Sequence, residues 1–131
     1  MTEPLAAFVL TIQTRPNQRG RKKLHVYIWK HKKDLRAAAH EHSVESAHFW
    51  KTAAGAYVGH VECRQFGEIH LWEKLIGAGY FAHELQHFVN HYSQETENYP
   101  LDFEANERMA WLVGELTAQF WTKFYKKFEI Q

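Results

Sequence analysis

Two histidines and a glutamate stand at the spacing of a metal-binding motif in the segment His83-Glu84-Leu85-Gln86-His87. If this segment is helical, four residues make about one turn, so His83 and His87 lie on the same face. Two imidazoles one turn apart can bind one zinc ion, and Glu84 lies to the side, where it can act on a zinc-bound water. The pattern therefore predicts a zinc hydrolase, and among these a peptidase.

The residues around the motif have the spacing of an amphipathic helix, from Tyr80 to about Tyr92. Its apolar side chains share one stripe, which contains Phe81, Leu85, Phe88 and Tyr92. At about 100° per residue counted from Phe81, the stripe spans about −20° to +80°, while the two histidines fall at about 200° and 240°. We therefore expect this helix to bury one side and to present His83 and His87 on the other.

A catalytic zinc site needs a third protein ligand and an open position. A third histidine in the pattern H-E-x-x-H-x-x-G-x-x-H is excluded, because residue 90 is Asn and residue 93 is Ser. A carboxylate from a second helix is the other common solution. Three acids stand near the start of the expected final helix: Asp102, Glu104 and Glu107.

Among these acids, Glu107 is the predicted ligand. It shares a line of the helix with Gly114 and Ala118, whose small size would let this helix approach the motif helix closely. Glu104 falls in the first turn, where the helix dipole favours an acid, and Asp102 suits the N-cap position. The sequence therefore predicts a metal site formed by His83, His87 and Glu107.

At this point the chain resembles a known family. The motif, followed by Asn106-Glu107, resembles the gluzincin pattern of thermolysin-type peptidases, and the stretch 107–116 resembles small phage and prophage proteins described as zinc metallopeptidases. The resemblance covers residues 78–120 and implies a minimal zincin-like α+β domain, with a small antiparallel or mixed sheet, the motif helix and a long C-terminal helix. The chain departs from thermolysin at Trp111, where an acidic residue that supports the ligands is expected. In a related group of small peptidases, Asp102 or Glu104 would be the ligand instead.

The hypothesis that follows is metal-assisted amide hydrolysis with a division of roles. Zinc would lower the pKa of its water, and Glu84 would take the proton and pass it to the leaving amine. His91 is the favoured donor to the oxyanion, because it lies beside Glu84 on the helix projection; Tyr92 and Tyr99 are the alternatives. In such folds the strand before the motif helix, here Glu68–Glu73, is commonly the edge that pairs with a peptide substrate.

The elements that must position these residues follow from local patterns. Two alternating segments, 8–15 and 24–31, predict a hairpin with a basic tip, and Asp34 is a good N-cap for a helix to about Trp50. Two further strands, 55–66 and 68–75, are expected around Gly67. A break at 77–79, a polar loop at 93–100 and a final helix capped by Asp102 and ending near Lys127 complete the chain.

Composition sets the class of protein. With 131 residues, 45% of them hydrophobic, the chain is expected to form one domain, 1–131, with one core. The single cysteine, Cys63, rules out an intramolecular disulfide and fits a reducing cytoplasm. The sequence shows neither the basic start of a signal peptide nor an apolar run long enough for a membrane span, so a cytoplasmic protein is expected.

Positive charge is concentrated in residues 15–36, which hold nine of the 16 Lys and Arg residues. This segment is either a solvated loop with strand ends or a patch for nucleic acid or another anionic partner. Two alternatives to a plain peptidase follow from it. One is a non-catalytic binding or regulatory protein on a zincin scaffold, and the other is a protease held on nucleic acid.

Overall fold

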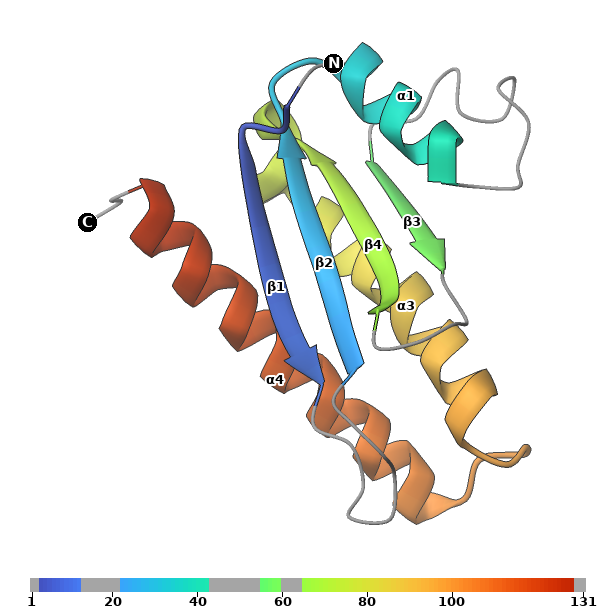
Figure 1. The fold of residues 1–131 in the computed structure, drawn as a ribbon. Helices are drawn as coiled ribbons and strands as arrows, with labels where there is room; N and C mark the ends of the chain where they lie inside the picture. The colour runs from blue at the N-terminus through green and yellow to red at the C-terminus, as the bar shows by residue number, and fades with distance from the viewer. Residues whose placement is uncertain (1–2, 13–21, 43–54, 60–64, 129–131) are drawn as a thin grey trace.

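The computed structural model describes residues 3–12, 22–42, 55–59 and 65–128, which form an α+β fold (Figure 1). The described elements are, in chain order, β1 (Ala6–Ile12), β2 (Lys22–Trp29), α1 (Lys32–His42), β3 (Gly55–Gly59), β4 (Gln65–Trp72), the 3₁₀ helix η1 (Glu73–Ala78), α3 (Tyr80–Thr96) and α4 (Phe103–Phe128). The expected α+β class with a mixed sheet and a long C-terminal helix is confirmed. No helix in the described part of the chain is long and apolar enough to cross a membrane.

The four strands form one sheet in the order β1-β2-β4-β3. β1 and β2 are antiparallel, as the predicted hairpin requires, although the expected basic tip lies outside the described residues. β2 and β4 run parallel, and β3 returns antiparallel to β4. β4 therefore has a partner on each side, and the expectation that the strand before the motif helix is an edge was wrong. On that side of the described sheet the edge strand is β3.

The helices pack on the two faces of the sheet. α3 and α4 cover one face, seen behind the strands in Figure 1, where Leu24, Val26 and Ile28 of β2 join the main core. Because side chains alternate along a strand, the neighbours of these residues point to the opposite face. There Ala56 and Val58 of β3 pack against Ala39 of α1. Helix α3, which carries the motif, thus packs against β3 and β4.

A buried polar chain lies on the opposite face from α3. Trp29 Nε1 donates to His70 Nδ1 over 3.0 Å, and His70 Nε2 lies 2.9 Å from Glu68 Oε1. Because the indole nitrogen can only donate, Nδ1 of His70 must accept, so the proton of the neutral ring is on Nε2 and is donated to Glu68. Both ring nitrogens are therefore satisfied, and His70 has a structural role.

Gly67 lies within β4, not at the expected turn. A Cβ at this position would lie 2.7 Å from the ring of Tyr57 on β3, so the missing side chain makes room for that ring. The expected strand 68–75 also ends early, at Trp72, where η1 begins. The expected break at 77–79 is confirmed at Gly79, whose φ of 84° ends η1 and starts α3.

The ends of the other helices differ from expectation by a few residues. α1 begins at Lys32, so Asp34 lies in its first turn and is not its N-cap, and the expected continuation to Trp50 falls outside the described residues. α3 extends into the expected loop 93–100 as far as Thr96, whose hydroxyl donates to the carbonyl of Tyr92 over 2.7 Å. For α4 the N-cap prediction is confirmed, because Asp102 Oδ1 accepts the amide of Ala105 over 2.8 Å.

The outer edge of β1 is covered by α4. The side-chain amide of Gln119 accepts from the Thr11 amide over 2.9 Å and donates to the Thr11 carbonyl over 3.0 Å. Lys123 donates to the carbonyl of Val9 in the same strand. These bonds occupy main-chain groups that an additional strand would need, so β1 is a protected edge.

Candidate metal centre and active site

The first turns of α3 bring His83, Glu84 and His87 together. One ligand atom from each of the three lies within 4.8 Å of the others, and the two imidazole centroids are 4.9 Å apart. Both histidines are exposed, whereas Glu84 is 5% exposed. The apolar stripe is buried as predicted, and the motif therefore presents two accessible imidazoles beside a buried carboxylate.

Glu84 is buried against the start of β3. A Cβ added to Gly55 would lie 3.0 Å from Glu84 Oε2, so the glycine leaves the space that the carboxylate occupies. Burial removes water from this carboxylate and raises its pKa to about 7. A carboxyl group that titrates near neutrality can both accept and return a proton at physiological pH, as a general base and acid must.

His91 lies two turns further along the same side of α3, against the other end of β3. Its Nδ1 is 2.7 Å from the hydroxyl of Tyr57, and its Nε2 is 3.7 Å from Glu95 Oε1. A Cβ on Gly59 would lie 2.7 Å from the His91 ring, so here too a glycine allows the close approach of strand and helix. Burial raises the pKa of the Tyr57 hydroxyl, which keeps it protonated and able to donate to His91.

Tyr57 and the two glycines were not anticipated from the sequence. Their roles depend on β3 lying along α3, and strand order is set by contacts between distant segments. The available signal was the pattern Gly55-Ala-Tyr57-Val-Gly59, since glycine within a strand often marks a close approach of another group.

Glu107 does not join this group of side chains. Helices α3 and α4 run antiparallel, because Phe81 stacks on Phe120 near one end and Glu97 binds Arg108 near the other. Glu107 precedes Arg108 and is therefore level with the C-terminal end of α3, about 15 Å along the helix axis from His87. It is exposed, and its assignment as the third ligand stays a prediction.

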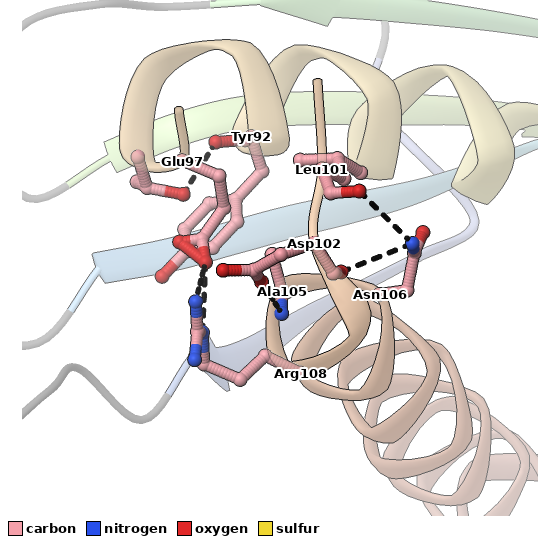
Figure 2. A network of polar contacts seen from close by, with 8 residues as sticks. Tyr92, Glu97, Leu101, Asp102, Ala105, Asn106 and Arg108 are labelled. Atoms are coloured by element: carbon pink, nitrogen blue, oxygen red, sulfur yellow. Dashed lines mark hydrogen bonds and ion pairs between the residues drawn. The ribbon is translucent and has the colours of Figure 1, made fainter. Parts of the chain in front are cut away.

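The two alternative acids lie at the start of α4, and Figure 2 shows the polar contacts of one of them, Asp102. Asp102 caps α4 through Ala105, and its main-chain carbonyl accepts from the Asn106 side chain over 3.1 Å. Glu104 is exposed in the first turn of α4. Among the described residues, the metal-ligand group of α3 includes neither of them.

The two tyrosines considered as alternatives to His91 lie towards the C-terminal end of α3. Tyr92 is 7% exposed and belongs to the core. The Tyr99 hydroxyl contacts Ser93 Oγ, about two turns beyond the histidine pair. Of the three candidate donors, His91 lies nearest along the helix to His87.

Comparison with protein-family models, with curated proteins and with solved structures gives no match for this chain. The resemblance to zincins therefore rests on the motif, its helical setting and the α+β fold. These observations support a proposal of function and do not assign the chain to a family.

Proposed function

We propose that the protein is a zinc-dependent peptidase of minimal zincin-like architecture. The observation that carries this proposal is the buried Glu84 carboxylate, with its raised pKa, between two exposed imidazoles whose nitrogens lie within 4.8 Å of it. Burying an unpaired charge is costly, so a carboxylate without a function at this position would be expected to be exposed to solvent.

The donor set fits zinc. Imidazole nitrogen is a preferred zinc ligand, and both histidines are accessible from solvent at one-turn spacing. His83 and His87 would hold the ion, with Glu107 as the proposed third ligand. A zinc ion bound there would act as a Lewis acid on the scissile carbonyl and acidify water.

In this proposal Glu84 acts as the general base and then as the general acid. Its carboxylate takes a proton from the attacking water as the oxygen adds to the peptide carbonyl carbon. When the C–N bond breaks, the same proton passes from Glu84 to the leaving nitrogen, so the base is regenerated. His91, held by the Tyr57 hydroxyl, is the proposed donor to the carbonyl oxygen as charge develops on it.

An extended peptide is the substrate class that we propose, bound along β3. Within the described sheet β3 has one strand partner, β4, and its two ends contact Glu84 and His91 of α3. Main-chain pairing with β3 would place a scissile bond beside the motif with little dependence on sequence. Because the outer edge of β1 is protected, we expect such pairing at β3.

The decisive experiment measures bound metal and hydrolysis of a dye-labelled unfolded protein in parallel. Glu84→Gln is expected to keep stoichiometric zinc and to lose activity by about 10²- to 10⁴-fold. Gln86→Ala, an exposed change in the same helix turn, is the matched control and should leave both unchanged. A wild-type protein without stoichiometric zinc, or a Glu84→Gln variant with full activity, would refute the proposal.

A second candidate function is binding to nucleic acid through the basic segment. Its described part includes Lys32, whose Nζ lies 4.7 Å from the centroid of Trp72, with Lys74 on the same ring at 5.8 Å. Lysines around an accessible indole are suited to phosphates and bases. This candidate predicts binding to single-stranded DNA that falls steeply with salt and is lost in Trp72→Ala; binding that is independent of salt would exclude it.

A further inference from the structure

Helix α4 carries a second, outward-facing stripe that the peptidase proposal does not use. Its members alternate at spacings of three and four residues: Trp111, Gly114, Ala118, the half-buried Trp121 and Tyr125. Trp111 is 75% exposed and Tyr125 48%, and Phe103, at the start of the same helix, is 78% exposed. The opposite face of α4 supplies Leu112, Leu116 and Phe120 to the core. A 3–4 repeat of this kind is the pattern of helices that pack against another helix.

Gly114, within this stripe, has no packing partner in the part of the chain that the structure describes. A Cβ built on it meets nothing within 4 Å. Glycine in a helix interior costs about 1 kcal/mol relative to alanine, so an open position would be expected to carry a better helix former. A glycine with space around it is instead what a second helix needs in order to approach closely.

The stripe is complementary to itself when two copies run antiparallel about a point between residues 114 and 115. In that register Trp111 lies opposite the partner's Ala118, so each large ring meets a small side chain. Tyr125 lies opposite the partner's Glu104, within reach of a hydroxyl–carboxylate hydrogen bond. A parallel arrangement would instead place Trp111 against the partner's Trp111.

Charge favours the same direction. The N-terminal part of α4 exposes Glu104 and Glu107, and the C-terminal part exposes Lys126 and Lys127. Antiparallel packing brings the acidic end of one helix to the basic end of the other and opposes the two helix dipoles. Glu104 and Lys126 also lie on the same side of the stripe. When two identical helices pack antiparallel, this side of one helix lies next to the same side of the other helix.

We propose that α4 is the interface of an antiparallel homodimer with Gly114 next to its two-fold axis. The proposal does not depend on the peptidase function. The helix has 26 residues, or about 39 Å, so a single helix pair buries less surface than a standard interface. The dimer is therefore expected to be reversible, with monomer dominating on dilution.

Sedimentation velocity over a concentration series tests this proposal. Wild type should shift from monomer towards dimer with concentration, and Trp111→Ala and Gly114→Leu should each weaken dimerisation by at least about tenfold. Leu5→Ala, which removes an exposed apolar side chain outside α4, should not. Circular dichroism of the dilute variants shows whether each still folds. A wild type that stays monomeric at millimolar concentration, or folded variants that dimerise like wild type, overturns the proposal.

A charge exchange tests the antiparallel direction. Glu104→Lys alone and Lys126→Glu alone should each weaken the dimer by several-fold, since each places like charges together. The double variant restores opposite charges across the interface and should recover most of the lost affinity. A double variant that is weaker than both single variants would overturn the antiparallel register.

Discussion

Gly55 of β3 lies directly against the carboxylate of Glu84, so that a Cβ at this position would lie 3.0 Å from Oε2. The backbone of one strand therefore helps to fix the side chain that we propose as the general base. Because glycine has no side chain, the Glu84 carboxylate can lie close to the backbone here. Adding one methyl group at residue 55 therefore tests the importance of this contact.

Gly55→Ala is expected to lower hydrolytic activity by about 10- to 100-fold, because it displaces the Glu84 carboxylate from the position that it shares with the histidine pair. Zinc content should not change, since His83 and His87 point to solvent. Gly77→Ala is the control, because a Cβ there meets nothing within 4 Å. If both variants lose activity equally, the contact with Gly55 has no specific role. The assay is steady-state hydrolysis, with bound metal measured on the same samples.

The raised pKa of Glu84 makes the metal-free protein sensitive to pH. The pKa is about 7 in the folded chain and 4.5 in its reference state, so the folded state prefers the protonated group. Its contribution to stability is present below pH 4.5 and is lost as pH rises through 7. The total loss is at most about 3 kcal/mol.

Glu84→Gln should remove this dependence, because a neutral amide does not titrate. With a chelator present, the variant should exceed wild type in free energy of unfolding at pH 8 and differ little at pH 4.5. Urea denaturation at the two pH values gives the comparison. An identical pH dependence in both proteins would show that Glu84 titrates normally.

The third metal ligand can be identified by removing one carboxylate charge at a time. Glu107→Gln should lower zinc affinity by about 10- to 100-fold if Glu107 is a ligand. Glu104→Gln is the matched change three residues earlier in the same helix. Because the structure places Glu107 level with the end of α3, ligation requires α4 to change its position. Unaltered zinc affinity in Glu107→Gln, measured by competition with a chelating dye, would remove it from the site.

Local patterns predicted the elements that carry the motif. The apolar stripe of α3 and the cap by Asp102 depend on residues within a few positions of each other, and both are confirmed. The extension of α3 to Thr96 was missed because the residues after Tyr92 are polar and show no apolar periodicity.

Contacts between distant segments could not be read in the same way. Gly67 was interpreted as a turn, whereas it accommodates Tyr57 from the neighbouring strand. The order that places β4 inside the sheet depends on pairing with β2, whose residues lie about forty positions earlier. The third ligand could not be read from local patterns either, since the approach of α4 to α3 is set by packing along the whole length of both helices.

The pair formed by Tyr57 and His91 should act as one unit. Tyr57→Phe keeps the ring that packs on Phe88 but removes the hydroxyl that lies 2.7 Å from His91 Nδ1. If His91 donates to the developing oxyanion, losing this support should lower kcat more than it raises KM, by about tenfold or more.

The double variant tests the coupling directly. His91→Ala alone should cost as much as His91→Ala combined with Tyr57→Phe, because the hydroxyl acts only through the imidazole. Tyr99→Phe is the control, since that hydroxyl contacts Ser93 near the far end of α3. Additive losses in kcat would mean that Tyr57 acts on the substrate by itself. No loss in either single variant would mean that the pair only joins β3 to α3, and urea denaturation would then show a cost of about 1 kcal/mol without an effect on catalysis.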